Sequence, residues 1–309
     1  MGDELVRLLR YLGYDDIGGH FRHPTRQALF VGDLVDRGPQ QVLAVQTVKG
    51  MVDGGSAKMV LGNHEIQVIE LFTPHRLPDR GHLMERTERH CDLHREFLDE
   101  VVEDSALHAE LIDWFMTVPM WLDLGDLRVV HACWDETSMA NLGGESAFTG
   151  DILHAQAEHG SVASVAVRNL IRGPAIEVDP PWHYKGGDPI PTARFSWWMD
   201  HDATVRELIS MSPYATAHAD ENCLGINGPP WEPADPTARV AEPPVDAYPA
   251  DAPPLFFGHY WRSGLPERVD LANAACVDFS ACRGGPLVAY RWSGERQLDP
   301  ANFAWATPG

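Results

Sequence analysis

The sequence predicts an α/β fold, because short apolar runs typical of strands alternate with stretches of helical periodicity. The runs 28–31 and 58–61 each end at a glycine, and between them Pro39 can begin a helix whose apolar residues recur at helical spacing. Strand, helix and strand joined by short turns form a βαβ unit, which favours parallel pairing. A further pair of runs, 120–124 and 127–130, flanks Gly125-Asp126 and predicts a hairpin.

The remaining elements follow from the same patterns in chain order. Apolar residues at helical spacing predict a helix over 3–11, and the helix that begins near Pro39 is expected to fray over 50–55. Residues 64–117 read as mostly helical. Their expected inner face comprises Phe97, Leu98, Val101, Leu107, Leu111 and Trp114. Another helix is expected near 161–171, followed by an aromatic segment, and short strands of a second sheet are expected at 255–257, 275–277 and 287–291.

Composition bounds the class of protein. The 309 residues carry a net charge of −21, and such an acidic chain disfavours nucleic acid as a partner. Five cysteines without a C-x-x-C pair indicate reduced thiols and a cytoplasmic protein. We find neither a signal peptide nor an apolar run of 18 residues, so no membrane is expected. We predict a single domain over 1–309, in which the proline-rich stretch 229–254 is a surface loop or a tether.

Two motifs carry the chemistry. Gly32 to Gly38 reads GDLVDRG, and Gly62 to Glu65 reads GNHE; each directly follows a predicted buried strand. A lone G-D-x-x-D can be a loop with helix-capping aspartates, but the second motif at this separation favours a metal site. Carboxylate, amide and imidazole groups at rigid strand ends are the ligands that a two-metal phosphoesterase needs.

Two later histidines repeat the pattern of an apolar strand followed by a candidate ligand. His131 follows Val129-Val130, and His259 follows Phe257-Gly258. Either histidine alone is more often a structural residue than a ligand, and only the order of the motifs favours ligation.

In these motifs the chain resembles the calcineurin-like metallophosphoesterase superfamily. The resemblance is to the branch of Ser/Thr protein phosphatases, diadenosine tetraphosphatases and bacterial polynucleotide-type phosphatases. The signature of the family is D-x-H, G-D-x-x-D-R-G, G-N-H-E and two later histidines, and all but the first motif occur here in order. The resemblance implies two mixed β-sheets packed as a sandwich flanked by helices, with the site between them at the strand ends.

The resemblance also implies roles for single residues. Asp33 resembles the ligand that bridges two metals, and the other ligands of the second metal are expected to be Asn63, His131 and His259. Tyr260-Trp261 after His259 departs from many relatives, which puts that ligand in more doubt than the others.

The same resemblance assigns the groups that handle phosphate and protons. Arg37 resembles the arginine that holds phosphate, His64 the acid that protonates the leaving oxygen, and Asp36 its orienting carboxylate. Asp278 matches an aspartate near the site in related bacterial phosphatases. Arg172 and Arg194 compete for the role of a second phosphate arginine, and either can instead be an ion-paired surface residue.

The Asp-x-His motif expected before the first helix is not found. Asp92-Leu93-His94 has the spacing but lies in a charged helical stretch, and Asp16 and His20 are spaced too widely. The other histidines, His94 among them, are taken as structural or solvent-facing. Either the first metal site was lost, or the first strand lies ahead of Met1; we favour the second, because a central strand is costly to delete.

The predicted function is hydrolysis of a phosphomonoester by metal-activated water, on a phosphorylated small molecule or a phosphoprotein. The alternatives are a diadenosine-tetraphosphatase-like hydrolase and a catalytically impaired protein that binds a single metal. The resemblance implies divalent metals, two in the family, of which a chain without the Asp-x-His motif is expected to bind one; Mn²⁺ is favoured over Fe or Zn. The oligomeric state stays open.

Overall fold

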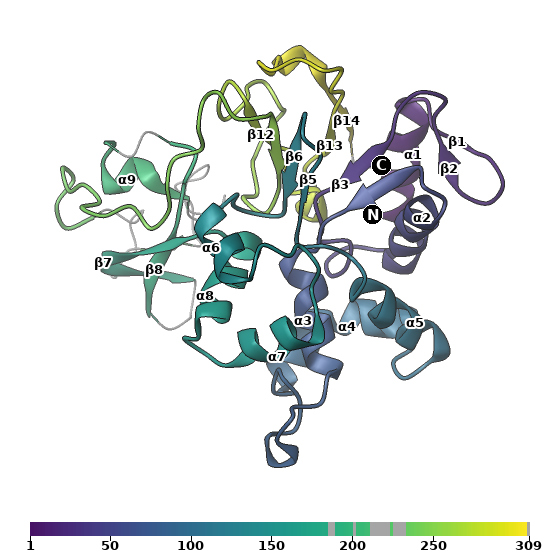
Figure 1. The fold of residues 1–309 in the computed structure, drawn as a ribbon, viewed down its shortest axis with the longest axis horizontal. Coiled ribbons are helices and arrows are strands. Elements are labelled where there is room, and N and C mark those ends of the chain that lie inside the picture. Colours follow the sequence, from purple (N-terminus) through teal and green to yellow (C-terminus); the bar gives the residue numbers. More distant parts are fainter. Residues whose placement is uncertain (185–188, 200–201, 211–222, 225–232, 308–309) are drawn as a thin grey trace.

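The computed structural model describes residues 1–184, 189–199, 202–210, 223–224 and 233–307, and it confirms the α/β class (Figure 1). Its α-helices are α1 (Gly2–Tyr11), α2 (Gln41–Asp53), α3 (Asn63–Phe72), α4 (Glu88–Val101), α5 (Ala106–Phe115), α6 (Glu136–Asn141), α7 (Gly150–Ala157), α8 (Val162–Arg172) and α9 (Val205–Leu208). Short 3-10 turns lie at Pro78–Arg80, Ala281–Arg283 and Pro300–Asn302.

The strands are short apart from one long antiparallel pair. They are β1 (Asp15–Asp16), β2 (Phe21–Arg22), β3 (Ala28–Phe30), β4 (Ala57–Met59), β5 (Trp121–Asp123), β6 (Arg128–Val130), β7 (Ala175–Tyr184), β8 (Pro189–Phe195), β9 (Ile209–Ser210), β10 (Cys223–Leu224), β11 (Leu255–Phe257), β12 (Ala274–Cys276), β13 (Leu287–Tyr290) and β14 (Phe303–Ala306). The predicted βαβ unit is β3–α2–β4, with β3 and β4 parallel, and the predicted hairpin is β5–β6.

The central sheet has the order β12-β11-β6-β5, in which β6, β11 and β12 are parallel. The second-sheet prediction was therefore only partly correct. The strand expected near 255–257 is β11, which pairs with β6 of the hairpin, and the strand expected near 275–277 is β12, which pairs with β11. Strand β13 instead pairs with β14. The pairing of β14, and the β7–β8 pair that projects to the left in Figure 1, had no clear pattern in the sequence.

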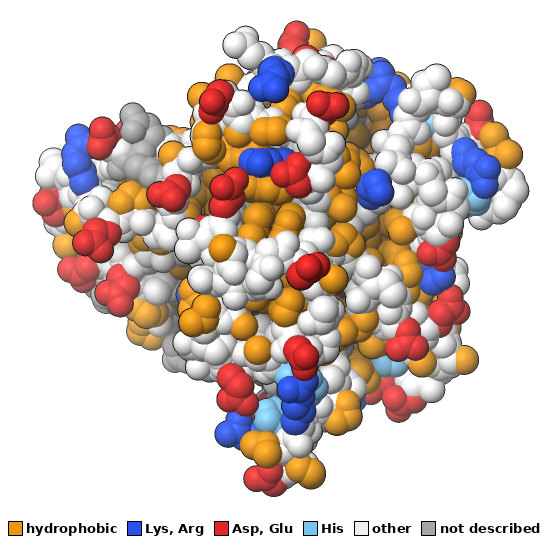
Figure 2. Space-filling model, in the orientation of Figure 1, with side chains coloured by type: hydrophobic (Ala, Val, Ile, Leu, Met, Phe, Trp, Pro, Cys, Tyr) orange, Lys and Arg blue, Asp and Glu red, His pale blue; other side chains and the backbone are white. Residues whose placement is uncertain are grey.

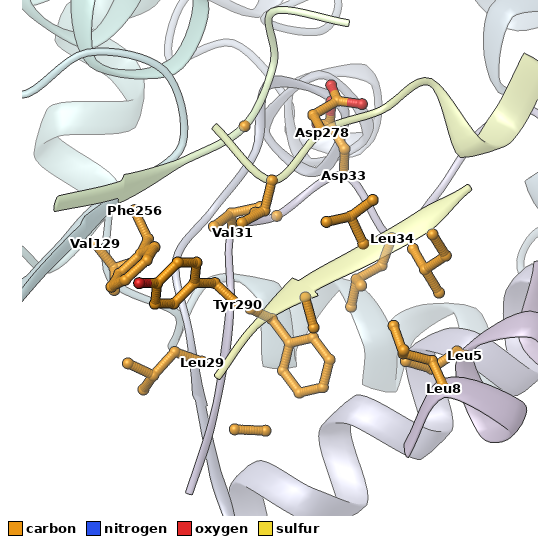
Figure 3. Close-up of a pocket in the computed structure, with 18 of the residues that line it drawn as sticks. Leu5, Leu8, Leu29, Val31, Asp33, Leu34, Val129, Phe256, Asp278 and Tyr290 are labelled. Carbon is orange, nitrogen blue, oxygen red and sulfur yellow. The ribbon is translucent and has the colours of Figure 1, made fainter. Parts of the chain in front are cut away.

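The layer that faces the central sheet is divided. Two strand pairs, β3–β4 and β13–β14, lie on either side of a cavity of about 670 Å³, which α1 closes from outside. In Figure 3, Leu29 of β3 and Tyr290 of β13 lie on one side of the view, and Leu5 and Leu8 of α1 lie on the other. Most of the lining is apolar, so the core of the sandwich contains a hollow next to the strand ends.

Both strands that border the hollow have an edge without a strand partner in the described chain. Ala28 N–H donates to Ser56 O, and Phe30 O accepts from Val60 N–H, so the backbone groups of Leu29 point away from β4. On β13, Arg291 N–H donates to Asn302 O, and by alternation the backbone groups of Tyr290 point away from β14. Within the described residues, β3 and β13 therefore each present an unpaired strand edge to this cavity.

Charge and surface agree with the composition. Acidic side chains are scattered over the face drawn in Figure 2, in keeping with the net charge of −21. In the part of the chain that the structure describes, no helix has the length and apolarity needed to cross a membrane. Residues 233–254 of the proline-rich stretch contain no helix or strand, and residues 229–232 lie outside the described residues.

Candidate metal centre

The two sequence motifs meet where β3 and β4 end, and two glycines allow this approach. A Cβ on Gly32 would lie 2.4 Å from Gly62 N, and a Cβ on Gly62 would lie 2.2 Å from Asp33 Oδ1. Gly32 also has a φ of 93°, which disfavours other residues. These contacts bring Asp33 against the start of α3, where the His64 backbone N–H donates to Asp33 Oδ1 at 3.1 Å.

Glu65 locks the two loops together, a role that the sequence analysis did not assign. Its buried carboxylate accepts hydrogen bonds from the backbone N–H groups of Asp33 at 2.9 Å, Leu34 at 2.6 Å and Gly62 at 2.9 Å. A capping box at the start of α3 accounts for the last of these bonds. The signal was a Glu three residues after a helix N-cap glycine.

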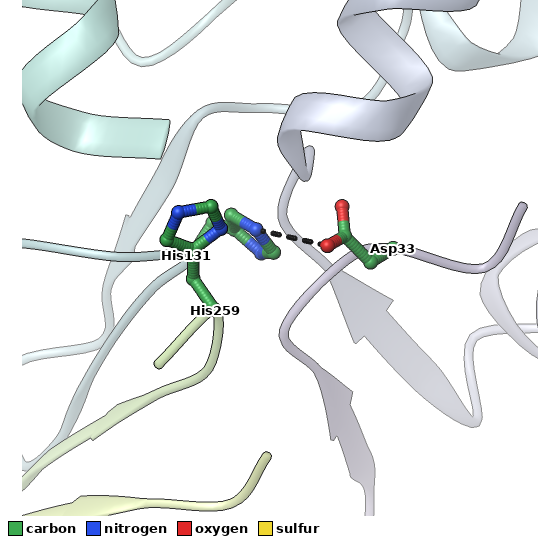
Figure 4. Close-up of side chains that lie close together, drawn as sticks. All are labelled: Asp33, His131 and His259. Carbon is green, nitrogen blue, oxygen red and sulfur yellow. Dashed lines mark ion pairs between the residues drawn. The ribbon is translucent and has the colours of Figure 1, made fainter. Parts of the chain in front are cut away.

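His131 lies at the end of β6 and faces Asp33 and Asn63. Its Nδ1 lies 2.5 Å from Val31 O, which fixes Nδ1 as the donor and turns Nε2 toward the site. Nε2 is 3.4 Å from Asp33 Oδ2, the contact drawn in Figure 4, and 3.3 Å from Asn63 Oδ1. Separations of this size are typical of ligand atoms that share one metal ion.

His259 completes this group from β11, the parallel neighbour of β6. Gly258 N–H donates to His131 O, which places the two histidine rings at the same strand end with centroids 5.1 Å apart. His259 is buried, and neither ring nitrogen has a hydrogen-bond partner within the described residues. Orphaned buried nitrogens are costly, so the ring fits a metal ligand better than a structural histidine.

The ligand atoms of Asp33, His131 and His259 lie within 4.8 Å of one another. One carboxylate, one amide oxygen and two imidazoles suit Mn²⁺, Fe or Zn, so the residues present fit a divalent metal. Asp278 lies beside Asp33 at one end of the cavity (Figure 3), and its Oδ1 accepts from Ser280 N–H at 3.0 Å. Asp278 therefore lies near the candidate metal centre, but it is not a member of the group formed by Asp33, His131 and His259.

Electrostatics distinguish the three ligands. Burial alone would raise the pKa of Asp33, but the nearby imidazoles of His131, His64 and His259 lower it below its ordinary value. Burial alone would lower the pKa of His131, yet the Asp33 carboxylate leaves it raised. For His259, burial and the cations Arg194 and His131 act together and hold the pKa well below the ordinary range. Without metal, the surroundings therefore favour the protonated form of His131 and the neutral form of His259.

The expected proton donor lies beside the ligands. His64 Nδ1 makes a short contact with Asp36 Oδ2, and both side chains are buried. Burial alone would lower the pKa of His64, but Asp33 and Asp36 raise it above its ordinary value. Asp33, Asp36 and Arg37 all have positive φ angles, 58°, 68° and 60°, and such backbone strain is concentrated at functional sites.

The three arginines differ in what they contact. Arg37 stacks on Trp261, with Cζ 4.8 Å from the ring centroid. Arg194 Nη1 donates to His259 O at 3.0 Å and so supports the loop that carries this ligand. Arg172 ends α8 with an exposed side chain that interacts electrostatically with Glu70 and Asp33. Besides burial, both arginines help to lower the pKa of His259, Arg194 more than Arg172.

The fold and this site together define the class of the metallophosphoesterases. The family model for Calcineurin-like phosphoesterase, Metallophos, matches residues 3–162, just over half of the 309-residue chain. The chain belongs to the calcineurin-like phosphoesterase family.

Its relatives among characterised proteins are similar over part of their length. The bis(5'-nucleosyl)-tetraphosphatase PrpE [asymmetrical] of Oceanobacillus iheyensis is 28% identical over 131 residues, 42% of this chain and 50% of that protein. The symmetrical bis(5'-nucleosyl)-tetraphosphatase of Methylococcus capsulatus is 31% identical over 146 residues, 45% of this chain and 44% of that protein. The chain thus spans about half the length of these relatives. A solved structure, the cold-active protein-tyrosine phosphatase of a psychrophilic Shewanella, aligns with a TM-score of 0.45 at 14% identity, over 96% of this chain and 76% of that one.

Proposed function

We propose that this chain is a metal-dependent phosphoesterase with Asp33, Asn63, His131 and His259 as ligands. The observation that carries the proposal is His259, whose two buried ring nitrogens have no partner in the described chain and lie beside the ligand atoms of Asp33 and His131. A divalent ion bound there, Mn²⁺ in our proposal, would supply charge neutralisation at the phosphoryl group and activation of water.

The chain's own residues would then bind the ester and move its proton. Arg37 is proposed to grip two phosphate oxygens with its planar fork, with Arg172 as the second phosphate arginine. His64, oriented through Nδ1 by Asp36, presents Nε2 for protonation of the leaving oxygen. Asp278 is proposed as a second-line carboxylate beside Asp33.

The substrate is proposed to be a phosphorylated small molecule. The names of the relatives favour a dinucleoside polyphosphate over a simple phosphomonoester or a phosphoprotein, and the acidic surface argues against nucleic acid. The similarity reaches both asymmetrical and symmetrical enzymes, so it leaves the position of cleavage undecided. We place the protein in the cytoplasm, because Cys91, Cys133, Cys276 and Cys282 are all free thiols.

The test is hydrolysis of p-nitrophenyl phosphate and of diadenosine tetraphosphate with Mn²⁺ and with excess chelator. We expect turnover that requires Mn²⁺ and that falls by about 10³-fold in Asp33→Asn, which removes a ligand charge. Asp126→Asn, in the exposed β5–β6 turn, removes the same charge away from the site and should leave turnover unchanged. Equal turnover in Asp33→Asn and in the control would contradict the proposal.

One observation favours the alternative of a single-metal, impaired protein. The described residues supply two compact groups of possible ligands, and in one of them His64 and His94 both contact Asp36 Oδ2 directly, which closes that group. The group around His131 remains, while the side toward β13 contributes only Asp33 and Asp278. We therefore expect calorimetry to find one tight Mn²⁺ per 309-residue chain. Two tight sites would show that this ligand count is wrong.

A further inference from the structure

His94 lies next to the proposed proton donor, although its sequence pattern offered only a misleading Asp-x-His. It projects from α4 and is fully buried. Its Nδ1 lies 2.7 Å from Asp36 Oδ2, the same oxygen that His64 Nδ1 contacts. Two imidazoles from different helices therefore converge on one carboxylate oxygen.

The other oxygen of this carboxylate does not fix its orientation. Asp36 Oδ1 is buried and has no hydrogen-bond partner within the described residues. Neither ring nitrogen of His94 makes a well-aligned hydrogen bond there, so its 2.7 Å approach to Oδ2 is a close contact between the two groups. Oδ2 alone therefore sets how the carboxylate is turned about its Cβ–Cγ bond. Burial alone would raise the pKa of Asp36, but its contacts with His64 and His94 lower it, so the group is a carboxylate held between the two rings.

Helix α4 also holds the turn that carries Asp36. Glu96 Oε2 accepts from Gly38 N–H at 3.1 Å, and Glu100 Oε2 accepts from Val42 N–H at 3.0 Å. These glutamates are four residues apart and lie on one face of the helix. His94 contacts Asp36 from the buried face of the same helix, so α4 contacts the segment from Asp36 to Val42 at three points.

A metal ion does not explain the group of Asp36, His64 and His94. Ligand atoms about 2.0–2.1 Å from a tetrahedral ion are separated by roughly 3.3 Å. The 2.7 Å between His94 Nδ1 and Asp36 Oδ2 is shorter than this, so the two side chains touch directly and leave no place for an ion between them.

We propose that His94 is a positioning residue for the proton donor. Its Nδ1 lies 2.7 Å from Asp36 Oδ2, and this contact holds the carboxylate in the orientation that fixes the ring of His64. Asp36 then holds Nδ1 of His64 as a donor, so Nε2 of His64 faces the leaving oxygen. The inference rests on the proposed function for its catalytic meaning, but the geometry of the three side chains can be tested without it.

The kinetic test compares two aryl esters that differ in their need for a proton. In His94→Leu we expect kcat for phenyl phosphate, which has a poor leaving group, to fall by about 10–30-fold, part of the roughly 10²–10⁴-fold that a general acid supplies. For 2,4-dinitrophenyl phosphate, whose leaving group departs unprotonated, the loss should be below about threefold. KM should change little for either ester, since His94 does not reach the phosphate.

Two further variants separate positioning from folding. His94→Asn keeps an N–H close to the position of Nδ1 and should restore most of the loss with phenyl phosphate. The matched control is His108→Leu, because His108 is a buried histidine on the neighbouring α5 that packs on Phe72 and does not contact Asp36. It should lower the turnover of both esters equally or not at all. An equal loss for both esters in His94→Leu would overturn the proposal.

If the chain hydrolyses neither ester, the proposed function is refuted. A spectroscopic test still measures whether His94 positions His64 in that case. Ring nitrogens of ¹⁵N-labelled protein report the tautomer of His64, whose signals are identified by their loss in His64→Asn. We expect a single Nδ1–H tautomer in the natural chain and a mixture in His94→Leu. An unchanged His64 tautomer in His94→Leu would overturn the positioning role.

Discussion

The side of the metal centre formed by β6 and β11 is solidly packed, whereas the side toward β13 and α1 is hollow. On the packed side the ligands His131 and His259 follow paired parallel strands, and Phe257 is fully buried against Trp197 and Trp198. On the hollow side the strand edges of β3 and β13 border the cavity of about 670 Å³.

The difference shows what a ligand position requires. A metal ligand must be held within about half an ångström, and paired strand ends packed on an aromatic core provide this. His131 and His259 lie on such ends and form the compact group with Asp33. The hollow side has apolar walls and a free strand edge, so it has a place for another strand but offers few ligands.

The largest effect is expected from filling the hollow. Met1 lines the cavity, so an extended apolar segment added ahead of it, ending in Asp-x-His-Gly, can enter between β3 and β13. We expect a second tight Mn²⁺ by calorimetry and a rise in turnover of about 10³-fold, because two ions can clamp both the attacking and the leaving oxygen.

The matched control carries the same segment with its Asp and His replaced by Asn and Gln. It should raise the melting temperature without adding a metal, since it supplies the strand but not the ligands. If neither segment changes the melting temperature, the cavity does not accept a strand. A missing strand would then not explain the difference between the packed side and the hollow side.

A smaller effect is expected from one substitution made on each side. Leu255 of β11 is fully buried on the packed side, while Leu29 of β3 lines the cavity and is only partly buried. We expect Leu255→Ala to lower the free energy of unfolding by about 3 kcal/mol and Leu29→Ala by about 1 kcal/mol, because Leu29 already borders empty space. Urea denaturation measures both, and equal losses would mean that the hollow is closed in solution.

Local chemistry made much of the fold predictable. The strands near 28–31 and 58–61 were predicted because each is a run of four mostly apolar residues that ends at a glycine, and the structure shows that these glycines allow the two loops to approach closely. The hairpin was predicted from its Gly125-Asp126 turn. The sheet to which β13 belongs was not predicted correctly, because its partner β14 begins after 12 intervening residues and has no strong alternating pattern. Pairing depends on long-range packing that no local pattern encodes.

The site residues divide in the same way. Asp33, Asn63, His131 and His259 were predicted from strand ends and motif order, and the structure brings them together. Whether they bind metal stays a prediction. The contact of His94 with Asp36 could not be predicted, because it depends on how α4 packs across the turn and not on any spacing in the sequence.

The smallest expected effect concerns the protonation of His131 and His259, the two histidines of the packed side. Without metal, the raised pKa of His131 stabilises the fold below pH 6.5, and this contribution is lost as the pH rises through the raised value. The lowered pKa of Asp33 contributes above pH 3.8 and is lost only in acid. Mn²⁺ needs neutral imidazoles, so its binding reverses the first of these dependences.

Binding of Mn²⁺ at pH 6.5 should therefore release about one proton, from His131, because His259 and Asp33 have already lost theirs. Calorimetry in two buffers of different ionisation enthalpy measures this number. The affinity should rise about tenfold per pH unit below the pKa of His131 and level off above it. Release of two protons would mean that His259 is protonated in the metal-free chain, which would contradict its assignment as a neutral imidazole ready to bind a metal.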